Sequence, residues 1–465
     1  MRRFVPCLAL LFTTNLFATN AVNAEEPGGL SFADALTAAR GGNESILAAR
    51  AETRQREEER KAARGLYFPT VSIDPLYTHL GEPILLDLNP IRDVILALHP
   101  QVPPALVPRF EEVLFKDDML RVPLAARWTL FAGGRIRAAN RAAEARLYDT
   151  EAQARQTEEG VLRSAVRAYF GLRLLIEEQA VREAVLQGLE QHVIDARRLE
   201  EEGLIARVER LNAEVARAEA DRQARRVGHD VRIARAGLAN VMAMDAAVGD
   251  PTTSLFVLRE MDPIGRFQEA ALAAHPALSR LEAQRALAQQ AVAAQKGSFL
   301  PEVFAYGLYE TRKADLSPIE PDWLAGVGVR FELFDGGARL RKLAAARAQK
   351  DRVEILDRKA RRDISTLVER QYREAEKARD QFDALESTGT LAEENLRARI
   401  RAFEEGLGTS LEVVDARLAQ AKVKLERLAA AHAFVNALAE LLEASGQGNR
   451  FEEIRMSPSA IEVQR

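Results

Sequence analysis

Two carboxylates three residues apart, Glu412 and Asp415, are the side chains of this chain whose spacing best suits chemistry. An i, i+3 pair lies on one face of a helix, where neighbouring carboxylates attract cations and resist simultaneous ionisation. The alternative is the solvated face of an exposed helix. The six histidines are scattered without metal-ligand spacing, and the sequence has neither a nucleophile motif nor a glycine loop for phosphate. The sequence therefore predicts no enzyme activity, no metal site and no cofactor.

The sequence that contains this pair has an internal duplication. The sequence YFPTV at 67–71 returns as FLPEV at 299–303, an offset of 232 residues. LFAGG at 130–134 returns as LFDGG at 333–337, and EEGL at 201–204 returns as EEGL at 404–407, both with an offset of 203. A repeat of this length indicates two copies of one supersecondary unit rather than several independent domains.

The N-terminus, residues 1–24, is typical of an export signal, because Arg2 and Arg3 precede a largely apolar stretch and small residues. The alternative is an ordinary buried N-terminal segment. Cys7 is the single cysteine and lies in this segment, so we expect a mature chain with no thiol, disulfide or lipid anchor. Positive and negative charges are mixed throughout, with a net charge of −4, which disfavours nucleic acid as a partner.

The first copy, residues 25–250, is predicted to contain a helix over 31–64, with Ser31 as its cap, and a β-hairpin over 70–130. A proline-rich loop, 79–118, accounts for the 29 extra residues of this copy. Gly133 and Gly134 then provide a sharp bend into a long helix, 136–202, because glycine tolerates positive φ. A turn at Gly203 and Leu204 leads to a returning helix, 208–246.

The second copy, residues 264–445, follows a connector, 251–263, and repeats this scheme. We expect a helix over 267–296, a β-hairpin over 302–333, bends at Gly336 and Gly337, and helices over 339–405 and 409–445. The last helix carries apolar residues at spacings of three and four, which indicates packing on a partner helix; they are Leu411, Val414, Leu418, Ala421, Leu425, Leu428, Val435, Ala439 and Leu442, with His432 among them. The C-terminal tail, 446–465, is predicted to be weakly ordered.

Beyond the export signal, the sequence lacks the roughly 18 consecutive apolar residues that a membrane-spanning helix needs. An exported chain of this kind that crosses a membrane must therefore use its strands. Four strands in an open sheet would leave two unsatisfied edges in lipid, so several chains must combine theirs. Trp128, Trp323, Tyr77 and Tyr309 are candidates for the membrane interface, or they cover the loop ends.

The order of elements, the proline-led strand starts, the glycine bends and the two EEGL turns resemble the TolC-like outer membrane efflux protein family over about residues 31–445. The resemblance implies a mainly α fold with a small β part, in which a homotrimer forms a 12-stranded outer-membrane β-barrel continuous with a 12-helix periplasmic α-barrel. It further implies a passive exit duct for efflux or type I secretion. Its partners would be outer-membrane lipid, a periplasmic adaptor protein and an inner-membrane pump.

The resemblance also assigns roles to particular residues. Glu412 and Asp415 match the acidic pair of the family's pore constriction, at the tip formed by Gly406 and Leu407. Glu209 and Phe403 match contacts that hold the tip closed. Gly408 stands where a basic residue can form a salt bridge in the family, so closure here is expected to rest on packing or on another pair, with Arg207 or Arg401 as candidates.

Two other classes of function stay open on the sequence. An exported structural or adhesive coiled-coil protein without a conduit would need the long helices but not the four alternating strands. An exported enzyme would need a site that the sequence does not show. The transported cargo, the pump and the adaptor are not specified by any motif of the chain.

Overall fold

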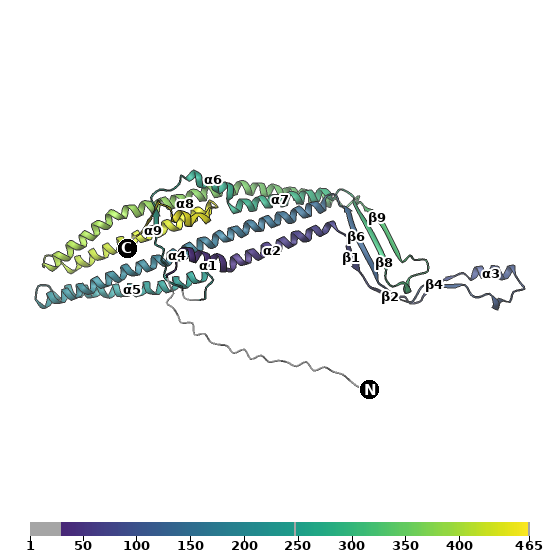
Figure 1. The fold of residues 1–465 in the computed structure, drawn as a ribbon, viewed down its shortest axis with the longest axis horizontal. Coiled ribbons are helices and arrows are strands. Elements are labelled where there is room, and N and C mark those ends of the chain that lie inside the picture. The colour runs from purple at the N-terminus through teal and green to yellow at the C-terminus, as the bar shows by residue number, and fades with distance from the viewer. Residues whose placement is uncertain (1–28, 246–247, 464–465) are drawn as a thin grey trace, which may run out of the picture.

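The computed structural model describes residues 29–245 and 248–463. The predicted export signal, residues 1–24 with Cys7, lies outside the described residues. The chain is elongated, with helical hairpins at one end, a small sheet toward the other end and an extension beyond the sheet (Figure 1). This arrangement is the duplicated helix and strand plan expected from the sequence.

Two helices of 67 residues each, α4 (Arg135–Glu201) and α8 (Ala338–Glu404), form the long axis. At 1.5 Å per residue each is about 100 Å long. Two helices of 35 residues, α5 (Arg207–Val241) and α9 (Ser410–Ala444), return along them. The predicted seam of α9 is buried at Val414, Ala421, Val435, Ala439 and Leu442, whereas Leu411 and Leu418 remain exposed. In the described part of the chain, no helix is both long enough and apolar enough to cross a membrane.

Each predicted leading helix is in fact two helices. α1 (Phe32–Gly42) ends before α2 (Glu44–Arg64), and α6 (Ile264–Ala274) ends before α7 (Pro276–Gly297). The breaks fall at Asn43 and His275, which are 232 residues apart and therefore equivalent in the two copies. Both residues are extended, and each caps the following helix by accepting a backbone N–H, from Ser45 and Ala277 respectively. The expectation of unbroken helices was wrong because these caps stop the first helix and start the second.

The central sheet is antiparallel, with the order β1 (Thr70–Ile73), β6 (Pro123–Phe131), β8 (Glu302–Glu310) and β9 (Trp323–Arg330). The pairing of β6 with β8 joins the hairpin of the first copy to that of the second. β1 and β9 are the outer strands, so each presents one edge without a partner strand within the described residues. The last strand ends at Arg330, three residues before the predicted limit.

The predicted 79–118 loop is instead an ordered extension. β2 (Leu76–His79) pairs with β5 (Asp118–Arg121), and β3 (Ile84–Asp87) pairs with β4 (Glu111–Phe115). Between β3 and β4 lie α3 (Asn89–Leu98) and the short helix η2 (Pro104–Leu106). Pro75 and Pro123 separate the extension from the central sheet, because proline has no N–H to continue a ladder. Tyr77 therefore lies in the extension rather than in the central sheet.

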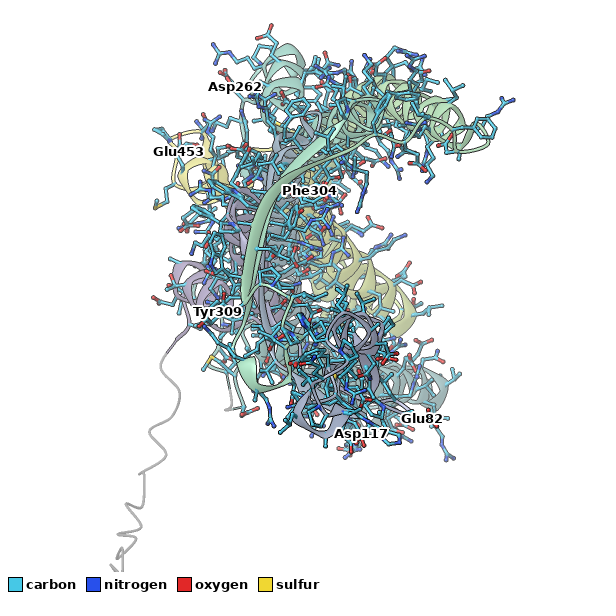
Figure 2. All side chains as sticks on the ribbon, turned by 90° about the vertical axis from the view of Figure 1, so that its right-hand side faces the viewer. Glu82, Asp117, Asp262, Phe304, Tyr309 and Glu453 are labelled. Carbon is cyan, nitrogen blue, oxygen red and sulfur yellow. The ribbon has the colours of Figure 1, made fainter. Side chains whose placement is uncertain are left out.

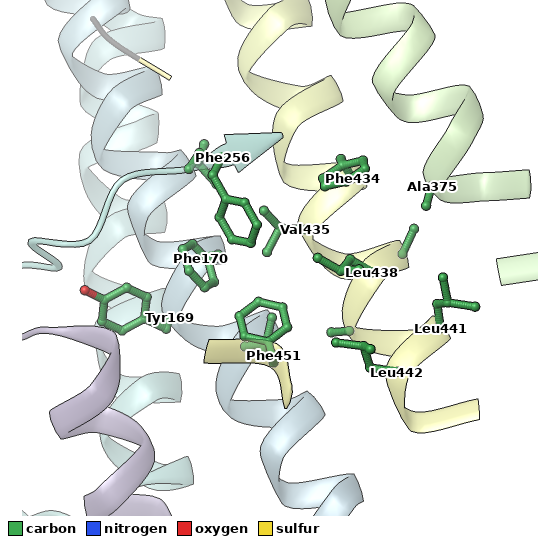
Figure 3. Packing of buried hydrophobic residues seen from close by; sticks show 14 of the residues in the cluster. Tyr169, Phe170, Phe256, Ala375, Phe434, Val435, Leu438, Leu441, Leu442 and Phe451 are labelled. Atoms are coloured by element: carbon green, nitrogen blue, oxygen red, sulfur yellow. The ribbon is translucent and has the colours of Figure 1, made fainter. Parts of the chain in front are cut away.

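The main core lies about halfway along the helices, where aromatic side chains from distant segments meet (Figure 3). Phe451 packs against Phe32, Phe170 and Phe256, with ring centroids 5.4 to 6.1 Å apart. Phe451 belongs to α10 (Phe451–Arg455), which follows the short helix η4 (Gly448–Arg450). Further along, β10 (Ala460–Glu462) pairs with β7 (Phe256–Leu258) of the connector. The prediction of a weakly ordered tail was wrong because Phe451 completes this core.

Candidate functional site

The two EEGL turns close the helical hairpins with the same geometry. Gly203 has φ of +77° and Gly406 has φ of +74°, values that favour glycine. The N–H of Leu204 bonds to the carbonyl of Leu199, and the N–H of Leu407 bonds to the carbonyl of Ala402, each at 2.8 Å. These bonds satisfy carbonyls at the ends of α4 and α8. The sequence repeat thus produces two equivalent turns at one end of the molecule.

Four side chains, one from each of α4, α5, α8 and α9, join the two hairpins beside these turns; we call His192, Glu209, Phe403 and Ser410 the tip cluster. The Glu209 Oε2 accepts a hydrogen bond from the backbone N–H of Ser410 at 2.9 Å. His192 Nε2 lies 2.8 Å from Ser410 Oγ, and the rings of His192 and Phe403 have centroids 4.7 Å apart. The cluster therefore ties all four long helices together.

The tip cluster excludes water from its centre. His192 is 5% exposed and Phe403 is 2% exposed. Burial, with a smaller contribution from the nearby Arg417 charge, lowers the pKa of His192. The imidazole is therefore neutral at pH 7, and protonating it would place a charge against the apolar ring of Phe403.

The predicted acidic pair is divided between two environments. Glu412 forms a capping box with Thr409, because its Oε2 accepts the Thr409 N–H at 3.0 Å while Thr409 Oγ1 accepts the Glu412 N–H at 3.3 Å. The Oε1 of Glu412 lies 3.0 Å from the Arg399 guanidinium. Asp415, one turn later, is exposed and forms no ion pair with the residues that the structure describes. Glu412 is thus partly neutralised within its own chain, and a constriction role for this pair stays a prediction.

Gly408, which stands where the family can carry a basic residue, has little space for a side chain. A Cβ atom there would lie 3.3 Å from the backbone nitrogen of Phe403. Among residues 29–245 and 248–463, neither Arg207 nor Arg401 forms an ion pair, whereas Arg399 pairs with Glu412. The ion pair beside this turn therefore joins α8 to α9 through Arg399, a residue that the sequence did not indicate.

The two strand-to-helix bends share a backbone conformation but differ in crowding. Gly133 and Gly134 have φ of +61° and +82°, and Gly336 and Gly337 have φ of +68° and +82°. A Cβ at Gly133 would lie 2.3 Å from the carbonyl oxygen of Gly297, whereas one at Gly336 would meet nothing within 4 Å. The first bend is therefore fixed against α7, and the second is open.

The central sheet has one apolar face and one polar face. Its register places only apolar side chains, glycine and tyrosine on the first face: Val71, Ile73, Leu124, Ala126, Trp128, Val303, Ala305, Gly307, Tyr309, Trp323, Ala325, Val327 and Val329. The second face carries all the charged residues of the sheet, Arg127, Glu302, Glu310 and Arg330, together with Thr70, Ser72, Thr129, Pro123, Ala125, Phe304, Tyr306, Leu308, Leu324, Gly326 and Gly328. Figure 2 shows Phe304 and Tyr309 along β8, which the register assigns to the polar and the apolar face respectively.

The polar face is tied together by charge. Arg127 lies 3.3 Å from Glu302, which also pairs with Arg135 at 2.8 Å. The Arg127 guanidinium stacks 4.4 Å from the ring centroid of Phe304. Gly328, opposite Phe304, leaves room for that ring, because a Cβ there would lie 2.5 Å from it. This face can contact water and passing solutes, whereas the opposite face can contact lipid.

A second titratable group lies near the core, where α4 meets the end of α9. Burial raises the pKa of Glu159 to about 7, and the charge of Glu443 adds to this rise. Burial also raises the pKa of Glu443, although Arg163 lies 2.7 Å from its carboxylate. Glu159 and Glu443 line one surface pocket together with His275, the cap of α7. In the described residues, no group of three or more histidine, cysteine, aspartate or glutamate side chains is arranged to hold a metal ion.

His192 and Ser410 were not among the residues that the sequence predicted at the tip. A signal for His192 was present, because it falls in line with Leu189, Ala196 and Leu199, all of which are buried on α4. A histidine in such a stripe needs a hydrogen-bond partner. Ser410 carried no such signal, because its role depends on the turn that brings α9 beside α4.

Comparison with known proteins agrees with this architecture. Residues 268–447 match the family model described as outer membrane efflux protein. Protein CyaE of Bordetella pertussis is 29% identical over 283 residues, which cover 58% of this chain and 58% of CyaE, so less than two thirds of that relative is matched. The outer membrane efflux protein BepC of Brucella suis is 25% identical over 327 residues, covering 68% of this chain and 70% of BepC.

Solved structures share the fold over nearly the whole chain. The outer membrane protein VceC from Vibrio cholerae has a TM-score of 0.72 at 16% identity, covering 90% of this chain and 96% of VceC. The open state of the Neisseria gonorrhoeae MtrE outer membrane channel has a TM-score of 0.72 at 16% identity, covering 90% of this chain and 89% of MtrE. Residues 268–447 therefore match the outer membrane efflux protein family, and the chain as a whole shares the fold of these solved outer-membrane proteins.

Proposed function

We propose that this chain is the outer-membrane exit duct of a tripartite efflux or type I secretion system, and that it acts as a passive conduit without catalysis. The observation that carries this proposal is the central sheet, with one face apolar on all four strands and every charged residue on the other face. A sheet of this kind suits a wall between lipid and an aqueous channel. β6 and β8 each have nine residues, about 30 Å at 3.3 Å per residue, which matches a bilayer core of about 30 Å.

The free edges of β1 and β9 imply more than one copy. In lipid each unpaired backbone group costs several kcal/mol, so the edge of one copy must pair with the opposite edge of the next. Three copies would give a closed sheet of twelve strands, as the family resemblance implies. The polar face, with Arg127 and Glu302, would then line the channel.

The helical part continues the duct away from the membrane. α4 and α8 are each about 100 Å long, far more than a bilayer core of about 30 Å. This length suits a tunnel through the periplasm that meets an adaptor protein and an inner-membrane pump at the tips. Energy for transport would come from the pump, as the family resemblance implies.

The tip cluster is the contact that we assign to the closed state. It joins the α4–α5 hairpin to the α8–α9 hairpin through Glu209, Ser410, His192 and Phe403. Opening the tunnel requires these hairpins to separate, which breaks the Glu209 to Ser410 hydrogen bond. Glu412 and Asp415 would form the constriction next to it, with Asp415 as the freely charged member.

Conductance across a planar lipid bilayer tests the duct. The purified chain should have the mass of a trimer and should give cation-selective pores that widen when the tip cluster is removed. Val71→Asp places a charge on the apolar face and should reduce insertion, because a charge at the middle of the lipid face is unfavourable, by about 2–4 kcal/mol for Arg or Lys and by less for Asp. Ser72→Asp, one residue later on the polar face, is the matched control and should still insert.

A rod-like structural or adhesive protein is the rival function. Such a protein would not need a sheet with opposed apolar and charged faces. A monomer that gives no conductance, even with Glu412→Ala and Asp415→Ala, would exclude the duct and favour the rod.

A further inference from the structure

The extension, residues 74–122, is the largest difference between the two copies, because the strands of the second hairpin are joined by only residues 311–322. It ends in α3, which lies at the end of the molecule opposite the helical tips (Figure 1). We propose that the apolar side of α3 packs against α3 of the other copies in the same assembly, so that three extensions form a cap over the outer end of the duct. This inference rests on the proposed trimeric duct.

The outward side of α3 is apolar. Ile91, Val94, Ile95 and Leu98 follow the i, i+3, i+4, i+7 spacing of one helix face. No residue of α3 is buried by the rest of the described chain, and Val94 and Leu98 are 58% and 71% exposed. A helix of 10 residues is marginal in water without packing on an apolar face. The face of α3 therefore requires a partner that the described residues do not supply.

The opposite side of α3 is fixed to its own chain. Arg92 donates to the carbonyl oxygens of Val107 and Pro104 at 3.0 and 2.9 Å. Asn89 Oδ1 accepts the N–H of Phe110 at 3.1 Å. These bonds hold the helix against the returning segment, so the apolar side is directed outward.

The base of the extension is held by the second hairpin. Asp315 accepts bonds from Lys116 Nζ at 3.0 Å and from the N–H of Leu120 at 3.2 Å. The buried Glu310 accepts the N–H of Val122 at 2.8 Å. These carboxylates fix the direction in which the extension leaves the sheet, and hence the position of α3 in every copy.

Within the part of the chain that the structure describes, the ribbon that carries α3 also has no further strand paired with it. β3 and β4 form a sheet of only two strands, and such a ribbon is marginally stable in water by itself. Several of its apolar side chains are exposed, namely Ile84, Leu85, Leu86 and Val113. Association of the extensions would cover these side chains together with α3.

A second copy fits this surface better than a lipid surface does. Residues 76–87 lead from the sheet to α3, and at about 3.3 Å per residue they carry the helix about 40 Å beyond strands that already match a bilayer core. Residues 84–115 contain four carboxylates and only two arginines, so anionic headgroups would repel the segment. In contrast, each extension continues from β1, a free edge of the sheet. Pairing of β1 with β9 of the next copy would therefore gather the extensions around one axis.

Disulfide crosslinking of the full chain in detergent tests the contact. The natural Cys7 is first changed by Cys7→Ser, and Val94→Cys then places a thiol on the apolar side. Asp93→Cys, on the far side of the same helix, is the matched control. Because a disulfide needs Cα atoms within about 7 Å, oxidation should give covalent dimers from Val94→Cys at a yield about tenfold above that of Asp93→Cys.

Mass and conductance of the same samples separate the possible failures. Trimers that conduct but show no preference for Val94→Cys would overturn the cap and leave the duct intact. Monomers without conductance would overturn both. Crosslinks that join separate trimers would overturn the cap, because they would assign α3 to a contact between assemblies. The cap would also be overturned if no crosslink forms and the fluorescence emission of a bimane label at Val94→Cys shifts to blue with phosphatidylglycerol vesicles, which would assign α3 to lipid.

Discussion

The two copies of the repeat agree along their length and differ at their ends. Their long helices have 67 residues in both copies, and their returning helices have 35. At one end, the first copy has the extension and the second has a short loop. At the other end, the equivalent first-turn glutamates have separate roles, since Glu209 reaches across to Ser410 while Glu412 caps its own helix. Helix length is fixed because neighbouring helices must span the same distance, whereas exposed ends are free to diverge.

The largest expected difference between the copies concerns the bends. Gly133→Ala should lower the free energy of unfolding by about 3 kcal/mol or more, because it combines strained positive φ with a collision against the Gly297 carbonyl. Gly336→Ala meets nothing within 4 Å and should cost only about 1 kcal/mol for its φ. Thermal unfolding of both variants, followed by circular dichroism, makes the comparison. Equal losses would show that crowding by α7 does not distinguish the bends.

The tip cluster gives the next largest difference. Phe403→Ala removes a buried ring and should cost about 3 kcal/mol, and it should also increase conductance by loosening the two hairpins. The residue 203 positions earlier is Glu200, which is paired with Arg210 at the surface of the other turn. Glu200→Ala should cost less than about 1 kcal/mol and leave conductance unchanged. Chemical denaturation and bilayer recording on each variant test this. A rise in conductance for Glu200→Ala but not for Phe403→Ala would contradict the role assigned to Phe403 and place the closing contact in the first copy.

The next difference between the copies is the pH dependence of stability at Glu159. The folded-state pKa of Glu159 is raised from 4.5 to about 7, so its contribution to stability is present below about pH 4.5 and is lost as the pH rises through 7. Glu159→Gln should therefore stabilise the chain at pH 8, by about 1–2 kcal/mol after allowance for partial exposure, and have little effect at pH 4. The equivalent residue of the second copy is the exposed Arg362, and Arg362→Gln should show no such pH dependence. Melting temperatures across pH 4–8 provide the measurement.

The smallest effects should separate the two equivalent glutamates. Glu412→Gln weakens a capping box and an ion pair, and should cost about 1 kcal/mol while reducing cation selectivity. Glu209→Gln keeps a hydrogen-bond acceptor for the Ser410 N–H but removes its charge, and should increase the frequency of opening with little loss of stability. Reversal potentials and open probabilities in bilayers distinguish these outcomes. Identical behaviour of the two variants would mean that the copies do not differ in role at the tip.

Much of the fold followed from local patterns. The ends of α4, α8 and α9 lie within one residue of the predicted limits, because glycine turns and apolar periodicity mark them, whereas α5 ends at Val241, five residues before the predicted limit. The breaks at Asn43 and His275 were missed, since each rests on one capping side chain within an otherwise helical pattern. The order of the tail was missed because Phe451 finds its partners only at positions hundreds of residues earlier in the chain.

The sequence by itself determined the duplication, the length of the helices, the bends at Gly133 and Gly336, and the alternation of the strands, because these depend on spacing and on backbone preferences of single residues. Only the tertiary structure decided that β6 pairs with β8, that Arg127 and Glu302 share a face, and that His192, Glu209, Phe403 and Ser410 meet. Those contacts join segments far apart in the chain, and no local preference specifies which distant partner a buried polar group will find.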